Sequence, residues 1–164
     1  SLFKNQSGTK QDKPKQFAKK IKIICNSRKN KDFMVIARIE SFILNKGLKD
    51  ALKRAEIYSK AGANAILIHS KERTPKEIFS FARIFKKSKN FIPLVSVPST
   101  YSKTYEKDLF KNGFKLVIYA NQLLRAAYPA MLNTAKDILL NSRSFDAEKK
   151  NKIIPISEII NLVK

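Results

Sequence analysis

The sequence is poor in cysteine, in acidic residues and in long apolar runs, and each shortage excludes a class of protein. Cys25 is the only cysteine among 164 residues, which excludes an intramolecular disulfide and a cysteine-based metal site. No apolar run approaches the roughly 18 residues of a membrane-spanning helix, and no signal-peptide core opens the chain. A lone free cysteine is typical of a reducing compartment, so we expect a cytoplasmic protein.

Glycine and proline are also scarce, at four and six residues, whereas 43% of the residues are hydrophobic. This balance is typical of a chain that fills a core and not of a disordered one. The length corresponds to one domain, and we expect a single partial domain over 1–164. The first residue is Ser and not Met, so we expect the sequence to begin inside a longer protein.

Acidic residues are outnumbered, because 13 Asp and Glu face 34 Lys and Arg and leave a net charge of +21. Such an excess attracts phosphate-bearing partners, including nucleic acid, without sequence specificity. The lysines are dispersed between apolar helix positions, as at Lys46, Lys49 and Lys53, and no nucleic-acid-binding motif accompanies them. We interpret them as solvated helix faces and keep a basic nucleic-acid-binding module as a remote alternative.

Short apolar runs that end in polar residues alternate with helical patterns along the chain. The runs predict strands over 33–37, 63–68, 92–97 and 116–120, each suited to burial on both faces of a parallel sheet. The helices are predicted over 15–27, 47–58 and 105–111, with another beginning at Thr74-Pro75 and with Gly62 closing the second. This alternation predicts right-handed βα units, either half of an eight-unit barrel or most of a small doubly wound sheet.

The region after the fourth strand has a different pattern. A helix over 122–142 is apolar most of the way round, which predicts burial on more than one side. We interpret it as the interface of a homo-oligomer, a dimer or a tetramer, with Pro129 kinking it or marking its true start. A charged linker over 144–151 and a terminal helix within 152–164 complete the chain.

Two ionisable side chains stand at the ends of the first two predicted strands. Arg38 presents a fixed cationic fork, and His69 can titrate or donate a hydrogen bond. In a barrel of parallel strands the active site lies at these carboxyl ends, so the pair predicts a cradle for a small anion. Glu40 faces the same side of the strand as Arg38 and is expected to orient either Arg38 or a metal-bound water. The alternatives are a purely structural ion pair and a core histidine.

Five stretches carry a resemblance to a known family: Ala37–Phe42, Gly47–Lys71, Val97–Tyr101, Val117–Ala126 and Lys152–Ile160. From Phe17 onward the chain resembles the phosphoenolpyruvate mutase family, within the isocitrate lyase superfamily. The resemblance implies an α/β fold, the C-terminal half of a (β/α)8 TIM-type barrel with parallel strands 5 to 8 and an extended C-terminal helix. It also implies that residues 1–14 are the remnant of the family's gating loop.

The family interconverts phosphoenolpyruvate and phosphonopyruvate, the step that forms the carbon–phosphorus bond in phosphonate biosynthesis. The resemblance implies that Arg38 and His69 are catalytic and bind the phosphoryl group, that Ser1, Leu2 and Ser70 bind substrate, and that Glu40 and Asn121 support them. It implies a Mg²⁺ cofactor whose ligands lie upstream of Ser1. We therefore expect no metal ligands in this sequence and no activity from it alone.

The nearest alternative is phosphonopyruvate hydrolase, a relative with the same arginine and histidine. The residue preceding Ser1 would help to separate the two activities, and it lies outside the sequence. Residues 39–42 and 121–125 favour the mutase, and the triplet His69-Ser70-Lys71 disfavours a lyase of the wider superfamily. Gln122 stands where relatives commonly carry histidine, so no role is assigned to it. A nucleotidyltransferase or decarboxylase domain after Lys164 stays open.

Overall fold

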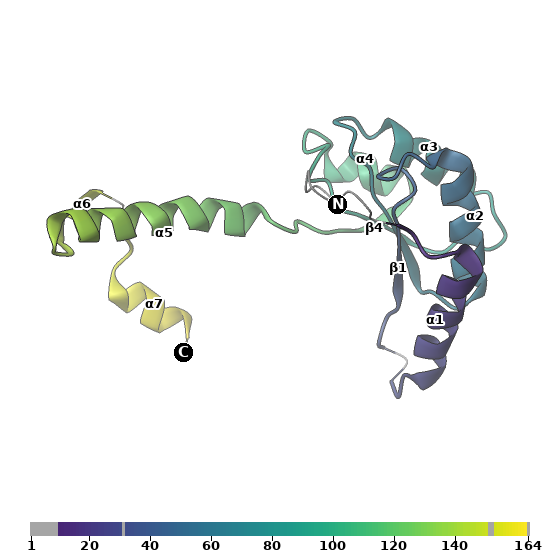
Figure 1. The fold of residues 1–164 in the computed structure, drawn as a ribbon, viewed down its shortest axis with the longest axis horizontal. Coiled ribbons are helices and arrows are strands. Elements are labelled where there is room, and N and C mark those ends of the chain that lie inside the picture. The colour runs from purple at the N-terminus through teal and green to yellow at the C-terminus, as the bar shows by residue number, and fades with distance from the viewer. Residues whose placement is uncertain (1–9, 31, 151–152, 164) are drawn as a thin grey trace. The chain divides into compact units, whose positions relative to one another are not determined.

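The computed structural model describes residues 10–30, 32–150 and 153–163. They divide after Ala120 into two compact units. The first unit contains, in order, α1 (Pro14–Ser27), β1 (Ile36–Ile39), α2 (Gly47–Lys60), β2 (Ala65–Ile68), α3 (Lys76–Phe85), β3 (Leu94–Ser96), α4 (Glu106–Lys111) and β4 (Phe114–Val117) (Figure 1). The second contains α5 (Gln122–Asn141), α6 (Phe145–Lys150) and α7 (Ile156–Leu162). The single partial domain over 1–164 stays a prediction.

The four strands form one sheet in the order β1-β2-β3-β4, and every neighbouring pair is parallel. Ile36 pairs with Ala65 and Ile66 with Leu94, so each strand pairs with the one before it in the sequence. A helix joins each strand to the next. The predicted α/β organisation with consecutive parallel βα units is therefore confirmed.

Helices cover one face of this sheet. Side chains that point to that face are fully buried, as for Ile39 in β1 and Ile66 in β2. They share one core with large residues of the helices: Ile21 of α1, Tyr58 of α2, Phe81 and Phe85 of α3, and Leu109 of α4. Burial of this apolar area, at about 25 cal/mol per Å², is the main force that holds the helices on the sheet.

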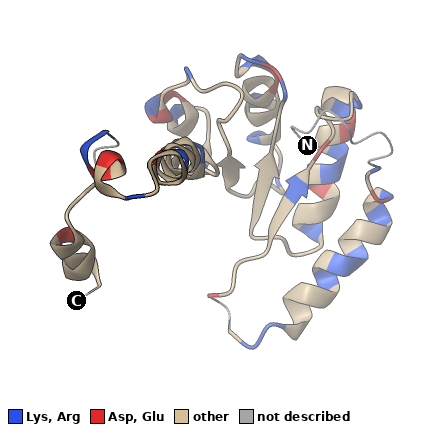
Figure 2. Ribbon diagram, turned by 60° about the vertical axis from the view of Figure 1, so that its left-hand side comes forward, with Lys and Arg blue, Asp and Glu red and all other residues tan. Residues whose placement is uncertain are grey.

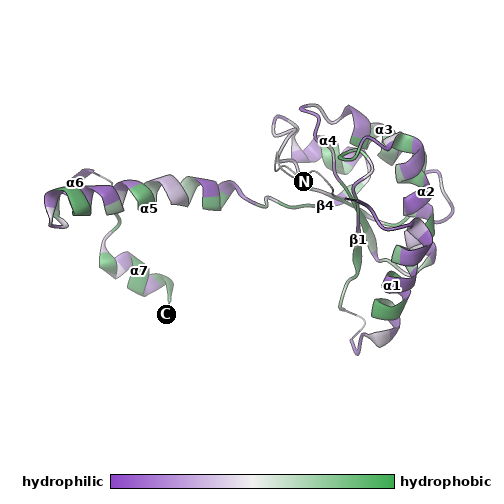
Figure 3. Cartoon of the chain, in the orientation of Figure 1, coloured by the Kyte–Doolittle hydropathy of each residue, from purple (hydrophilic) through white to green (hydrophobic). Residues whose placement is uncertain are grey.

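The opposite face of the sheet is less covered in the part of the chain that the structure describes. Burial alternates along β1, where Ile36 is 37% exposed and Ala37 is buried, and Leu116 in β4 is 45% exposed. Figure 3 shows that β1 is nevertheless largely hydrophobic. The prediction of burial on both faces is therefore wrong for β1, because only one of its faces meets helices.

The segment before β1 differs from the predicted strand over 33–37. The backbone N–H of Val35 donates to the Asn64 side-chain oxygen at 2.9 Å, and Arg28 Nη1 donates to the same oxygen at 2.9 Å. The Asn64 side chain thus takes the place of a strand partner at Val35. The pairing of β1 with β2 begins only at Ile36. The fourth strand likewise begins at Phe114, two residues before its predicted start.

Gly62 closes α2 as predicted. It follows the last helical turn with φ of +102°, which L side chains rarely adopt, and its N–H donates to the Ser59 carbonyl at 3.0 Å. The thiol of Cys25 in α1 donates to the Gly62 carbonyl at 3.2 Å. A Cβ on Gly62 would lie 3.4 Å from that sulfur, so the glycine also permits close approach of α1. At α3, by contrast, Pro75 is the N-cap and not the first helical residue.

The second unit begins with α5, which has no buried residue. Pro129 lies inside this helix, so the prediction that it could mark the start is wrong. The predicted linker over 144–151 contains α6, because Glu148 N–H donates to the Ser144 carbonyl at 3.0 Å and Ala147 is buried. The terminal helix begins only after Pro155. No helix in the described ranges is long and apolar enough to cross a membrane.

Candidate active site

Arg38 lies in β1 on the sheet face away from the helices, where it pairs in register with Leu67 of β2. Its Nε donates to Oε1 of Glu40, two residues further along the chain, so the expected contact between the two side chains is present. Half of the Arg38 side chain is exposed. The ion pair orients a guanidinium that still reaches solvent, which is the arrangement needed for binding an anion.

His69 follows β2 directly and is only 3% exposed. Ile39 pairs with Ile68, so Glu40 and His69 each occupy the position just beyond this register pair. Burial lowers the pKa of His69, the positive charge of Arg38 lowers it further, and Glu40 acts in the opposite direction. The imidazole is therefore neutral at neutral pH, with one ring nitrogen able to donate and the other to accept.

The Nδ1 atom of His69 has no hydrogen-bond partner among the described residues. A buried polar atom of this kind costs free energy unless something binds it. Such an atom beside a half-exposed arginine is the feature expected of a site that receives a ligand. Arg38 pairs in register with Leu67, two residues before His69, so the two residues lie near the carboxyl ends of adjacent strands, and their catalytic roles stay predictions.

Ser70 is fully buried, and it forms hydrogen bonds with neighbouring loops and with α3. Its hydroxyl donates to Oε2 of Glu77 and accepts the N–H of Glu72 at 3.0 Å. Its carbonyl accepts the hydroxyl of Thr100 at 2.8 Å, which ties the loops after β2 and β3 together. These contacts support a role in holding the loop that carries His69, and substrate binding by Ser70 stays a prediction.

A cavity of about 270 Å³ lies beside Arg38 and Glu40. The segment before α1, α1 itself and α2 form its other walls, through Lys10, Gln11, Asp12, Phe17, Arg54 and Tyr58. His69 is not among these residues, so the cavity extends from the Arg38–Glu40 pair toward α1 and α2. Sequence reasoning missed this side of the site.

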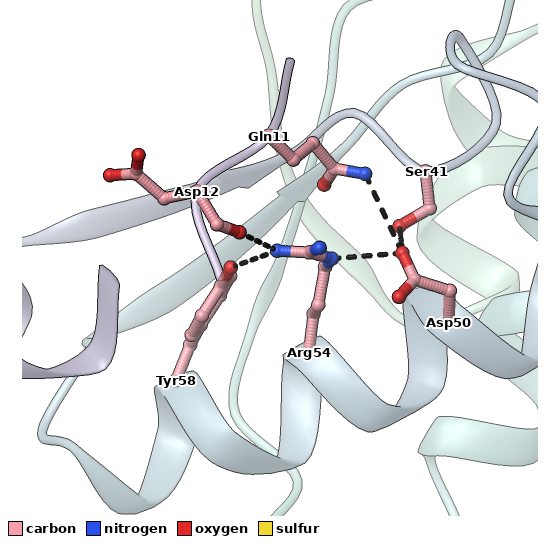
Figure 4. A network of polar contacts seen from close by, with 6 residues as sticks. All are labelled: Gln11, Asp12, Ser41, Asp50, Arg54 and Tyr58. Carbon is pink, nitrogen blue, oxygen red and sulfur yellow. Dashed lines mark hydrogen bonds and ion pairs between the residues drawn. The ribbon is translucent and has the colours of Figure 1, made fainter. Parts of the chain in front are cut away.

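Arg54 is the centre of a polar network in the lining of that cavity (Figure 4). Its Nε donates to Oδ2 of Asp50 at 2.8 Å, and its Nη1 donates at 2.9 Å both to the Asp12 carbonyl and to the Tyr58 hydroxyl. The Arg54 side chain is only 8% exposed. Partial burial would lower the pKa of Arg54, but its hydrogen bonds to Asp50 and Tyr58 raise it, so the guanidinium stays charged.

Asp50 gathers donors from two further segments of the chain. The Ser41 hydroxyl donates to its Oδ2 at 2.7 Å, and the Gln11 amide approaches the same oxygen at 3.5 Å. Partial burial acts to raise the pKa of Asp50, but hydrogen bonds from Arg54 and Ser41 hold it below its usual value. The Asp50 carboxylate is therefore ionised at neutral pH, and it accepts a hydrogen bond from Ser41, the residue directly after Glu40.

Three predicted site residues do not belong to the described part of the first unit. Ser1 and Leu2 fall outside the described residues. Asn121 belongs to the second unit, where its carbonyl accepts the N–H of Arg125 at 2.9 Å in the first turn of α5. Its supporting role, like the substrate-binding roles of Ser1 and Leu2, stays a prediction.

The described residues do not form a magnesium site. No group of three or more His, Cys, Asp or Glu among them lies close enough together to hold a metal ion. Mg²⁺ prefers six oxygen ligands, and Glu40, the carboxylate beside Arg38, is engaged in an ion pair. No step is therefore assigned to a metal held by these residues.

The positive charge is dispersed over the first unit. Lys or Arg residues occur on each of α1, α2, α3 and α4. Figure 2 shows them scattered over several helices and not gathered on one. A nucleic-acid-binding module would concentrate them on one face together with aromatic residues, so this arrangement favours solvated helix faces.

Comparisons with known proteins agree with one another. A family model described as phosphoenolpyruvate phosphomutase matches residues 3–139. The phosphoenolpyruvate phosphomutase of Tetrahymena pyriformis is 40% identical over 148 residues, which make up 90% of this chain and 47% of that protein. The phosphonopyruvate hydrolase of Variovorax sp. (strain Pal2) is 41% identical over 119 residues, 71% of this chain and 39% of that protein. The chain thus spans less than half the length of either relative.

The fold comparison also matches this chain to about half of a longer protein. A crystal structure of phosphonopyruvate hydrolase in complex with oxalate and Mg²⁺ matches with a TM-score of 0.82 at 33% identity, covering 98% of this chain and 55% of that one. The match confirms the predicted fold class, half of a (β/α)8 barrel with parallel strands. Magnesium is thus present in the solved structure of a similar protein.

Proposed function

This chain belongs to the phosphoenolpyruvate phosphomutase family, and from that premise we propose that the full-length protein interconverts phosphoenolpyruvate and phosphonopyruvate. The observation that supports the proposal is the placement of Arg38 and of a buried, neutral His69 near the carboxyl ends of adjacent parallel strands. Both side chains stand where a barrel of this kind builds its active site.

The reaction needs fixed positive charge and hydrogen-bond donors around a transferring phosphoryl group. From phosphonopyruvate to phosphoenolpyruvate, the C–P bond breaks and a P–O bond forms to the enolate oxygen. Charge spreads over three equatorial oxygens in a loose transition state. Arg38, held through Nε by Glu40, presents its two terminal nitrogens to these oxygens, and His69 adds a neutral donor.

A second candidate is phosphonopyruvate hydrolysis, because the Variovorax hydrolase is as similar as the mutase from Tetrahymena. In that reaction the same C–P bond breaks, the phosphoryl group passes to water, and the released enolate takes up a proton to give pyruvate. Arg38 and His69 would serve both reactions, so their geometry supports either.

Phosphorus NMR separates the two activities. The full-length protein is mixed with phosphonopyruvate and Mg²⁺, and a phosphoenolpyruvate signal is expected for the mutase or inorganic phosphate for the hydrolase. Arg38→Ala should lower the rate at least about 100-fold, the usual effect of removing one donor to a developing charge. Arg83→Ala, at an exposed position of α3, is the matched control and should keep full activity. An unchanged spectrum from folded wild-type protein would contradict both activities.

We also propose that the second unit mediates self-association through α5. The helix has no buried residue, and its Leu123, Leu139 and Leu140 are about four-fifths exposed. An exposed apolar surface of this size normally marks a protein–protein interface. Most soluble oligomers are homo-oligomers, so we take a second copy of this protein as the partner. Leu139→Lys should shift the sedimentation coefficient toward that of the monomer, whereas Lys136→Ala should not. A wild-type monomer at high concentration would refute the interface.

A further inference from the structure

Three segments that are distant in the sequence meet at the Asp50–Arg54 pair (Figure 4). Both residues lie in α2, one turn apart. Arg54 reaches back 42 residues to the Asp12 carbonyl, and Asp50 reaches Ser41 at the end of β1. The network therefore joins two segments that line the cavity beside Arg38, because Asp12 and Glu40 both belong to its lining.

We propose that Asp50 and Arg54 are positioning residues for the Arg38–Glu40 pair. Asp50 fixes the chain immediately after Glu40 through the Ser41 hydroxyl, and Arg54 fixes the facing segment through the Asp12 carbonyl. The predicted effect on turnover rests on the proposed function. The predicted hold on the segment around Asp12 rests on the geometry alone.

The short path from Asp50 to the candidate catalytic arginine supports this role. Ser41 is fully buried and bonded at 2.7 Å, so it cannot move without breaking its contact with Asp50. One peptide bond links Ser41 to Glu40, and the Glu40 carboxylate holds Nε of Arg38. A displacement of about 1 Å in a group that binds the reacting phosphoryl can cost about 100-fold in rate.

The chemistry of Arg54 explains why the position carries arginine although its helix is rich in lysine. The guanidinium donates from two different nitrogens, with Nε directed to Asp50 and Nη1 to Asp12 and Tyr58. An ammonium group is a point charge without this planar fork. Arg54→Lys therefore keeps the positive charge beside Asp50 and loses the link to the segment before α1.

Two variants test the proposal in the full-length protein. Ser41→Ala removes the hydroxyl that positions Glu40, and Arg54→Lys removes the link to Asp12. The matched control is Ser59→Ala, which removes a hydroxyl of the same helix that has no hydrogen-bond partner among the described residues. Turnover of phosphonopyruvate, thermal melting and tryptic cleavage after Lys10 are measured for each. The Lys13–Pro14 bond resists trypsin, so cleavage after Lys10 reports on this segment.

Ser41→Ala should lower kcat about 10- to 100-fold and change KM less than about threefold, because the charge of Arg38 remains while its placement shifts. Arg54→Lys should speed tryptic cleavage after Lys10. Ser59→Ala should change neither the turnover nor the rate of this cleavage. A lower melting temperature with unchanged kcat and KM in Ser41→Ala would show a merely structural contact and overturn the proposal.

The two hypotheses fail in different ways. If wild-type protein neither isomerises nor hydrolyses phosphonopyruvate, the proposed function is wrong, and the cleavage experiment still decides whether Arg54 holds the segment around Asp12. Equal cleavage rates for wild type and Arg54→Lys would overturn the positioning role even in an active enzyme. Faster cleavage in Arg54→Lys, together with a lower kcat in Ser41→Ala, would support both the proposed function and the positioning role.

Discussion

Removing the positive charge of Arg38 should raise the pKa of His69, and removing the negative charge of Glu40 should lower it. Burial is the largest cause of the depressed pKa, the Arg38 charge is second, and Glu40 opposes them. Arg38→Met should therefore move the pKa of His69 upward yet leave it below 6.5, because the imidazole stays buried. Glu40→Gln should move it further down.

The same pKa sets how stability depends on pH. His69 has a lower pKa in the folded chain than in the unfolded chain, so between the two values the unfolded chain binds one more proton. The free energy of unfolding then falls by up to about 1.4 kcal/mol per pH unit as the pH drops through this window. Well above pH 6.5 both states are neutral at His69, and its contribution to the slope disappears.

The assay is simple because His69 is the only histidine in the chain. Its single Hε1 resonance is followed by proton NMR from pH 8 to 5, with circular dichroism confirming the folded state at each point. Urea unfolding over the same range measures the slope, and Arg83→Met is the charge-matched control for Arg38→Met. A midpoint at or above 6.5 in folded wild-type protein, or shifts of the same sign in both variants, would refute the reasoning.

Further predictions concern stability. Phe81→Ala should destabilise the fold by about 3–5 kcal/mol in urea, because Phe81 is fully buried beside Phe85, whereas Ile84→Ala on the exposed side of α3 should cost far less. Gly62→Ala should cost at least about 1 kcal/mol by the same assay, because φ is +102°. The pKa of Asp50 is lower in the folded chain than its usual value of 3.8, so Asp50 stabilises the fold above pH 3.8. This stabilisation is lost as the pH falls through the pKa of the folded chain. Asp50→Asn should therefore reduce the fall in the free energy of unfolding at acid pH.

The sequence predicted the strands and the placement of Arg38 and His69 near their ends, because both depend on local patterns. The apolar runs over 33–37 and 63–68 mark the strands, and Arg38 and His69 stand near their ends because parallel strands share a carboxyl edge. The contact of Glu40 with Arg38 follows from the two-residue repeat of a strand. None of these inferences needed information from distant parts of the chain.

What the sequence could not predict depends on distant partners. The true start of β1 is set by the side chain of Asn64, 29 residues after Val35, and no local feature of 33–37 announces it. Arg54 resembles the lysines around it in α2, yet it is buried because Asp12 and Tyr58 surround it. The sequence did contain one indication of this network: Arg54 is the only arginine of α2, and Asp50 precedes it by one helical turn.

The sequential strand order has a consequence for how the chain acquires its fold. Ile36 pairs with Ala65, and Ile66 with Leu94, so each pairing closes a loop of fewer than about thirty residues, and the entropic cost of closure stays small. Among the four described strands, each pairs with a strand that is next to it in the sequence. We therefore expect each βα unit to be able to dock on its predecessor during translation, so that these four strands can pair in the order β1 to β4.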